Sequence, residues 1–289
     1  MTTLTATPIV ATNKVITPLT KAKLQDLVPA AFQSEANPKM SKHYQFVNTA
    51  EIISKLQKAG LKPFLANQLR YRQDKNDNVG YQMHKITFYH PDLVIMNAKG
   101  QIEEMFEVSI SNSHNGYSKF SLFGSFYRLA CDNGMLCMSN DMGHIVTRHM
   151  GEGVGDIQIL LDQLKDQYAS MAKNVKRMKT KSLSDEKMIE LATKMAEARN
   201  YKQKGKVAFN PEALLKPLRE SDKGRSLWKV YNVIQEKLIK GYDFEEADVV
   251  ETTSETGKKR SVKKIRTVNH FEVQMIMNKA MWDVAQSFA

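Results

Sequence analysis

The spacing of hydrophobic residues changes along this chain, and that change most constrains how it can fold. Between residues 63 and 108, apolar and polar residues mostly alternate, which is typical of half-buried strands. Short Asn-, Asp- and Gly-rich separators at 74–80 and 97–100 predict tight turns, and therefore an antiparallel meander. The segment 120–131 fits helix or strand equally well. The runs that predict strands are 65–72, 81–89, 93–96, 102–110, 135–138 and 145–149.

Past the glycines at 151, 153 and 155, the hydrophobic period becomes helical. Capping residues mark several helix ends. Asn48 or Thr49 can cap a helix, Glu51 completes a capping box with Asn48, and Gly60 ends that helix. Helices are predicted at 20–28, 49–59, 156–178, from 184, from 211, at 226–240 and at 271–288.

These patterns predict an α+β fold, with an antiparallel sheet and packed helices in the N-terminal half. The C-terminal half is expected to be mainly helical and to contain a β-hairpin. We divide the chain into a flexible N-terminal tail (1–19), an α+β domain (20–153) and a mainly helical basic region (154–289) with the hairpin near 244–268.

The balance of charge indicates the class of partner. The chain has 42 Lys and Arg against 31 Asp and Glu, a formal charge of +11 and a pI near 9.4. Such an excess favours binding to polyanions, of which nucleic acid is the commonest inside cells. The sequence offers neither a membrane-spanning apolar run nor a signal peptide, and its two cysteines do not suggest a disulfide scaffold. We therefore expect a cytoplasmic protein with no membrane partner.

The positive charge is densest between residues 173 and 206, where eleven Lys and Arg stand against four Asp and Glu. A cationic run with an interleaved aromatic suits a single-strand groove, while a solvated linker or a charged helix end would give the same composition. By contrast, the basic residues near 258–266 are balanced by acidic neighbours, and Trp228 and Tyr231 fall at core spacing. The predicted nucleic-acid contacts are Lys173, Lys176, Arg177, Lys179, Lys181, Arg199, Tyr201, Lys202, Lys204, Lys206 and Arg128.

A polar turn in the N-terminal half is the best alternative site. Small polar residues around a histidine can form a backbone nest for an anion, and Arg128 could complete a polar pocket. The simpler interpretation is two β-turns, at 115–116 and 133–134. The residues of this polar turn are Asn112, Ser113, His114, Asn115, Gly116, Ser118, Asn133 and Gly134. No spacing supports a metal site, a nucleophile pair or a cofactor.

The same residues carry a family resemblance. Residues 112–118 read NSHNGYS, similar to an NSHDG-S signature, and residues 128–134 read RLACDNG, similar to R-VC-NG. The block from Leu227 to Glu236 is similar to LW-VYNA--E. Over roughly residues 25–285 the chain thus resembles a phage- and plasmid-borne family known as domain of unknown function 932. Asn115 replaces the usual Asp, which argues against a metal-dependent reaction.

The resemblance implies a role in mobile elements and supplies no mechanism. Our first hypothesis is a nucleic-acid-binding accessory protein, such as a single-strand binding or annealing factor in recombination or replication, with homo-oligomerisation in keeping with that role. The second is a protein–protein module that blocks a host defence or modification enzyme, and therefore has a host protein as its partner. The third is an enzyme that uses His114, Ser118 and Arg128.

Overall fold

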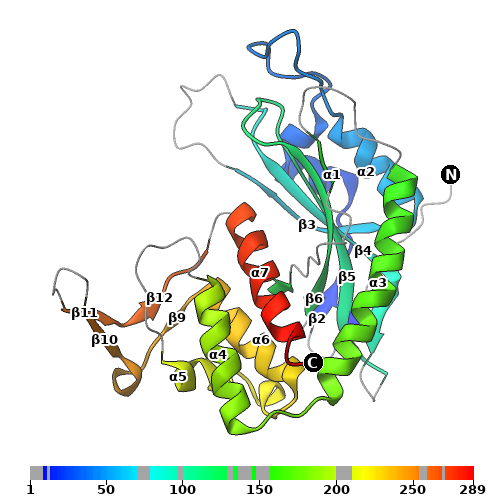
Figure 1. The fold of residues 1–289 in the computed structure, drawn as a ribbon. Coiled ribbons are helices and arrows are strands. Elements are labelled where there is room, and N and C mark those ends of the chain that lie inside the picture. Colours follow the sequence, from blue (N-terminus) through cyan, green and yellow to red (C-terminus); the bar gives the residue numbers. More distant parts are fainter. Residues whose placement is uncertain are drawn as a thin grey trace. The chain divides into compact units, whose positions relative to one another are not determined.

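A computed structural model gives the architecture shown in Figure 1. It describes residues 9–11, 14–69, 79–96, 100–128, 133–135, 145–147, 157–199, 210–253, 259–268 and 271–289. The chain forms two compact units. Unit 1 comprises Met1–Gly134 and Asp141–Tyr168, and unit 2 comprises Met135–Asn140 and Ala169–Ala289. The class is α+β, as predicted.

Unit 1 is built on a mainly antiparallel sheet. Its central strand β5 pairs with β4 along one edge, while β6 and, at a single position, β1 pair along the other. Strands β3 to β6 form the predicted meander, and β7 and β8 both pair with β6. The strands are β1 (Ile9–Ala11), β2 (Lys14–Ile16), β3 (Lys62–Gln68), β4 (His84–Met96), β5 (Ile102–Asn112), β6 (Phe120–Arg128), β7 (Asn133–Met135) and β8 (Ile145–Thr147).

One face of this sheet is apolar because alternate residues of the paired strands point the same way. The cross-strand row Ile86, Ile110 and Leu122 is fully buried. Helix α2 (Thr49–Lys58) lies beside this face and buries its own apolar stripe of Ile52, Ile53 and Leu56. The other helices of unit 1 are α1 (Lys21–Leu27), the 3-10 helix η1 (Pro29–Phe32) and the first half of α3 (Ile157–Thr180).

Unit 2 is a helical assembly whose core is aromatic. Tyr231 stacks on Trp228 with ring centroids 6.1 Å apart and meets Trp282 edge-on at 5.8 Å, so both predicted core residues of 226–240 are confirmed. Helix α4 packs on α5, α6 and α7 (Figure 1). The helices are α4 (Asp185–Arg199), α5 (Pro211–Leu215), η2 (Glu220–Asp222), α6 (Leu227–Lys240), η3 (Glu246–Asp248) and α7 (Phe271–Gln286).

Four short strands follow α6. Strands β10 (Val250–Thr253) and β11 (Lys259–Val262) form the predicted hairpin, and β9 (Tyr242–Asp243) pairs with β12 (Lys264–Ile265). Gly241 makes this turn possible because its φ is +93° and an added Cβ would lie 2.8 Å from the carbonyl oxygen of Ile265. Lys216 contacts two carboxylates of the acidic segment after β9, Glu245 at 2.8 Å and Asp248 at 2.6 Å.

Several predictions require correction. Residues 9–11 and 14–16 form strands of the sheet, although we expected them in a flexible tail. The predicted strands at 81–89 and 93–96 are one strand, β4, whose register shifts between Tyr89 and Val94. The ambiguous segment 120–131 contains strand β6. Asn133 and Gly134 belong to β7 and do not form the predicted turn. The separators at 74–78 and 97–99 lie outside the described residues.

Candidate nucleic-acid interface and the buried polar turn

The C-terminal half of α3 has a buried side and a basic side. At about 100° per residue, Met171, Val175 and Met178 cluster on one side, and all three are buried. Lys173, Lys176 and Arg177 fall on the opposite side and are exposed, and Lys181 follows just beyond the helix end. We call Lys173, Lys176, Arg177 and Lys181 the lysine face. Lys179 is off this face and half-buried.

The charge of the lysine face is largely uncompensated. Lys173, Lys176 and Lys181 form no ion pair with any residue that the structure describes, whereas Arg177 donates to Gln286 Oε1 at 3.2 Å. Cations are favoured here because the helix macrodipole places partial negative charge at the C-terminus. Helix termination alone can explain two or three of these cations, so the full set exceeds what helix stability requires.

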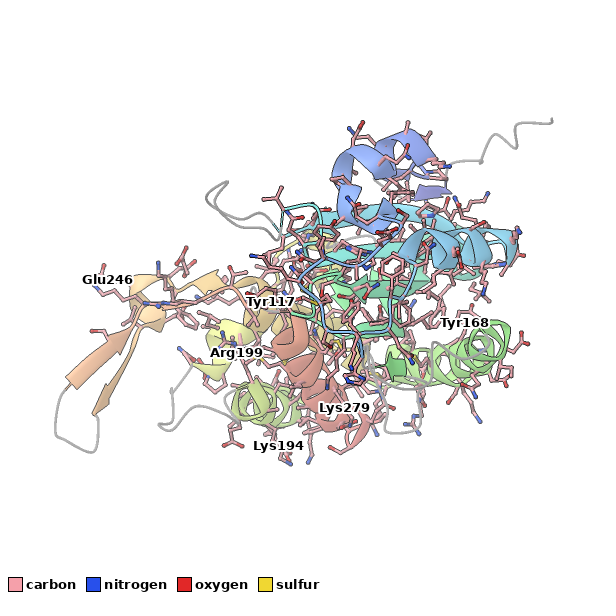
Figure 2. All side chains as sticks on the ribbon, turned by 90° about the horizontal axis from the view of Figure 1, so that it is seen from above. Tyr117, Tyr168, Lys194, Arg199, Glu246 and Lys279 are labelled. Carbon is pink, nitrogen blue, oxygen red and sulfur yellow. The ribbon has the colours of Figure 1, made fainter. Side chains whose placement is uncertain are left out.

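Arg199 has a different role from the one we predicted. It is only 8% exposed, its Nε donates to the carbonyl oxygen of Leu238 at 2.7 Å, and its Nη2 donates to that of Arg266 at 2.9 Å. The guanidinium therefore connects the end of α4 (Figure 2) to the end of α6 and to the segment after β12. We withdraw Arg199 from the nucleic-acid contacts because its donors are directed into the protein.

The remaining predicted contacts are only partly placed. Tyr201, Lys202, Lys204 and Lys206 lie outside the described residues. Arg128 ends strand β6, where its backbone is paired opposite Glu104, but its side chain is not described.

The first part of the polar turn, from Asn112 to Asn115, is buried. Asn112, Ser113 and His114 have no exposed surface, and Asn115 is 5% exposed. Asn112 Nδ2 donates to the carbonyl oxygen of Val47 at 3.1 Å and to Thr49 Oγ1 at 2.9 Å. These bonds attach the end of β5 to the start of α2.

Four backbone amides of the turn are already bonded within the protein, which argues against the anion-binding nest that we predicted. The amides of Ser113, His114, Tyr117 and Ser118 donate to Asn112 Oδ1, the Tyr81 carbonyl, Asn115 Oδ1 and Ser113 Oγ, respectively. Asn115 uses only its side-chain carbonyl oxygen in the bond to Tyr117, and an Asp at this position has an equivalent acceptor. The departure from the family signature therefore keeps this hydrogen bond of the turn.

The strand register argues against the polar pocket predicted around Arg128. Strands β5 and β6 pair antiparallel, with Ser111 opposite Ser121 next to the turn and Glu104 opposite Arg128 at the far end. At about 3.3 Å per residue, seven residues place the Arg128 backbone roughly 23 Å from the turn. Together with the burial of His114, this separation contradicts the enzymatic hypothesis built on these residues.

A chain of hydrogen bonds joins the turn to His84. Its Nδ1 lies 3.0 Å from the Gln82 carbonyl oxygen, so this nitrogen carries the proton. Its Nε2 then accepts from Thr49 Oγ1 at 3.0 Å, and Thr49 in turn accepts from Asn112. Burial lowers the pKa of His84 to about 4, although the hydrogen bond to the Gln82 backbone raises the pKa and offsets part of this effect. His84 is therefore a neutral, structural histidine at physiological pH.

The second face of the unit 1 sheet is polar and yet largely buried. Ser125 Oγ donates to Glu107 Oε1 at 2.5 Å, and Thr87 and Ser109 hydroxyls are 2.8 Å apart. Burial raises the pKa of Glu107 and lowers the pKa of Lys85, while each group's charge opposes the shift of the other. The opposite charges of Lys85 and Glu107 thus partly offset the effect of burial, and this face alone does not define a reaction.

Tyr117 is a residue that sequence analysis missed. It occupies the one position of the NSHDG-S signature that has no fixed residue, and it is 74% exposed, whereas Asn112 to Asn115 before it are buried. Figure 2 labels its side chain. An exposed aromatic on a rigid turn offers a stacking surface. The signal for it in the sequence was the glycine beside it, because a glycine favours a tight turn. In the structure, Gly116 has a φ of +73°.

Among the residues that the structure describes, no group of three or more His, Cys, Asp or Glu side chains is arranged to hold a metal ion. Likewise, none of the helices in that part of the chain combines the length and apolar character that crossing a membrane requires.

The fold and motifs define a family. The profile of the family described as Domain of unknown function (DUF932) matches residues 38–282, and the chain belongs to that family. Two relatives from Escherichia coli (strain K12) are similar to it over 279 residues. UPF0380 protein YfjQ is 24% identical and UPF0380 protein YafZ is 25% identical, each match covering 93% of this chain and 91% of the relative. No solved structure matches.

Proposed function

We propose that this protein binds nucleic acid through the lysine face of α3, as a cytoplasmic accessory factor in the replication or recombination of a phage or plasmid. The supporting observation is that Lys173 and Lys176 are exposed on the side of α3 opposite its buried residues and that Lys181 is exposed just past the helix end. None of the three forms an ion pair with a described residue. A solvated linker would have no such sidedness. The family membership agrees with this context without establishing it.

The size of the lysine face sets the strength of binding that it can provide. Residues 173–181 extend for about 12 Å at 1.5 Å per residue, which is enough to follow a few consecutive phosphates. If all four cations of the face contact phosphates, the slope of log K against log salt is about −3 on single strands and about −4 on duplex. Additional contacts elsewhere would steepen it. Contacts of this kind recognise the backbone and not the bases, so little sequence preference is expected.

Binding is tested by fluorescence anisotropy with labelled single- and double-stranded oligonucleotides at about 50, 100 and 200 mM salt. We expect micromolar or tighter affinity at the lowest salt and a loss of about fiftyfold across this range on single strands. Absence of binding at the lowest salt would remove the proposal. Binding that ignores salt would also contradict it, because neutralised phosphates must release counterions.

A further inference from the structure

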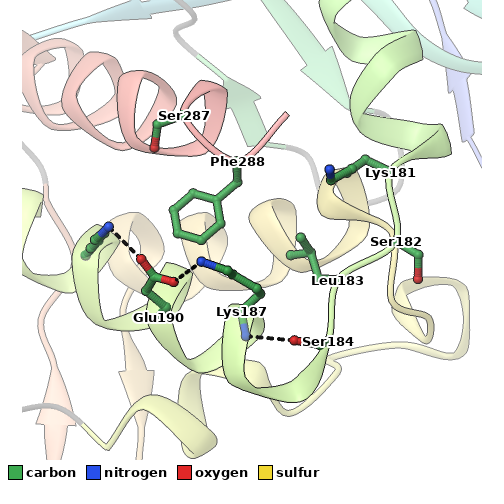
Figure 3. Close-up of a pocket in the computed structure, with 9 residues that line it drawn as sticks. Lys181, Ser182, Leu183, Ser184, Lys187, Glu190, Ser287 and Phe288 are labelled. Atoms are coloured by element: carbon green, nitrogen blue, oxygen red, sulfur yellow. Dashed lines mark hydrogen bonds and ion pairs between the residues drawn. The ribbon is translucent and has the colours of Figure 1, made fainter.

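Unit 2 contains a pocket with a volume of about 400 Å³ between the start of α4 and the end of α7 (Figure 3). This volume falls within the usual range of small-ligand sites, about 300–1,000 Å³. The residues that line it are Lys181, Ser182, Leu183, Ser184, Lys187, Glu190, Lys194, Ser287 and Phe288.

The segment that enters the pocket is held in place by its backbone. Ser182 forms an isolated antiparallel bridge with Ser226. The Leu183 amide donates to the Arg225 carbonyl at 2.9 Å, and the Leu227 amide donates to the Lys181 carbonyl at 2.7 Å. The lining is thus largely preformed, which lowers the ordering cost of binding.

The lining carries three lysines and one carboxylate. Glu190 accepts from Lys187 and from Lys194, each at 2.7 Å, and these two bonds lower the pKa of Glu190 to about 2. Lys181 forms no ion pair with any described residue. The lining therefore has a surplus of two positive charges, and each ammonium bonded to Glu190 has further N–H donors to offer.

Phe288 forms an apolar wall beside these charges. The Nζ atoms of Lys187 and Lys194 lie 5.7 Å and 5.3 Å from its ring centroid, and Leu183 adds another apolar surface (Figure 3). A ligand with an anionic group and a flat or apolar portion would match both parts of the pocket.

We infer that this pocket binds a phosphomonoester, and that it receives the terminal phosphate of a nucleic-acid strand lying along the lysine face. The second half of this inference rests on the proposed function. A terminal monoester carries close to two negative charges, which matches the surplus in the lining, whereas an internal diester carries one. Lys181 belongs to both the pocket and the lysine face, so the two surfaces are continuous at that residue.

The test compares oligonucleotides of one sequence with a 5′-phosphate, a 3′-phosphate or hydroxyl groups at both ends. The intact protein should bind one phosphorylated form about tenfold more tightly than the hydroxyl-ended form. The double variant Lys187→Gln/Lys194→Gln should lose this preference and keep its affinity for the hydroxyl-ended strand. The matched control Lys223→Gln/Lys279→Gln removes two other ion-paired lysines of unit 2 and should keep the preference.

The outcomes separate the pocket from the proposed function. Equal affinity of the intact protein for all three strands would contradict the inference that the pocket receives a terminal phosphate. It would leave the proposal of nucleic-acid binding standing. If no strand binds, adenosine monophosphate is titrated by calorimetry. Its binding to the intact protein and not to Lys187→Gln/Lys194→Gln would support a phosphomonoester pocket for free nucleotides, and no binding would overturn the pocket as well.

Discussion

Replacing Arg199 by methionine is expected to lower the free energy of unfolding by about 3 kcal/mol while leaving the nucleic-acid affinity of the folded protein unchanged. Arg199 donates two hydrogen bonds to backbone carbonyls from a site that is 8% exposed. Methionine retains much of the apolar stem but leaves both carbonyls without their charged donor. Bonds to charged groups contribute about 1.5–3 kcal/mol each, and neighbouring losses are not fully additive.

Urea denaturation and anisotropy on the same protein samples provide the check. Arg266→Met serves as the control. This substitution removes the same charge as Arg199→Met, but from a side chain that is exposed. It should change stability by less than about 0.5 kcal/mol. A stable Arg199→Met protein that binds nucleic acid more weakly than Arg266→Met would show that Arg199 contacts the ligand, contrary to our assignment.

The second large effect is a pH dependence that originates at His84. Burial lowers the pKa of this histidine to about 4 in the folded state, whereas its ordinary value is 6.5. A lowered folded-state pKa means that the stabilisation is fully present above pH 6.5 and is lost as the pH falls towards 4. The difference corresponds to about 3 kcal/mol. Protonation of His84 would also add a proton to Nε2, so this nitrogen could no longer accept the hydrogen bond from the Thr49 hydroxyl.

Other groups also titrate in this range, so the effect of His84 is obtained by comparison. The free energy of unfolding is measured in urea from pH 7.5 to 4 for the wild type, His84→Gln and His43→Gln. Glutamine removes the titration, and His84→Gln should therefore lose about 3 kcal/mol less than the wild type over this range. His43 is exposed, so its variant should follow the wild type. Identical pH dependences for all three proteins would refute the assignment.

Local signals in the sequence predicted much of the fold. Ser226 caps α6 by accepting from the Lys229 amide, Asn48 caps α2 by accepting from the Glu51 amide, and Gly241 ends α6 with a positive φ. These are interactions within a few residues, so the spacing of residue types contains them. The aromatic core of unit 2 was likewise visible as helical spacing of Trp228 and Tyr231.

Interactions between distant segments limited the prediction of the site. Composition placed Arg199 in a cationic run, but only the fold brings the carbonyls of Leu238 and Arg266 to its guanidinium. Proximity in the sequence suggested a pocket with Arg128, whereas strand register moves that residue to the far end of the hairpin. The sequence shows Lys187 and Lys194 only as two more cations of the basic segment. They line one pocket with Phe288 because α4 packs against α7, which the sequence does not reveal.

The most direct test of the lysine face compares two triple variants with the same net charge. Lys173→Gln/Lys176→Gln/Lys181→Gln removes three cations of the face, and Lys21→Gln/Lys23→Gln/Lys58→Gln removes three exposed cations of unit 1. The measurement is the slope of log K against log salt on a single-stranded oligonucleotide. We predict that the first variant reduces the magnitude of the slope by about 2 and that the second leaves it unchanged. Equal slopes for the two variants would contradict the account.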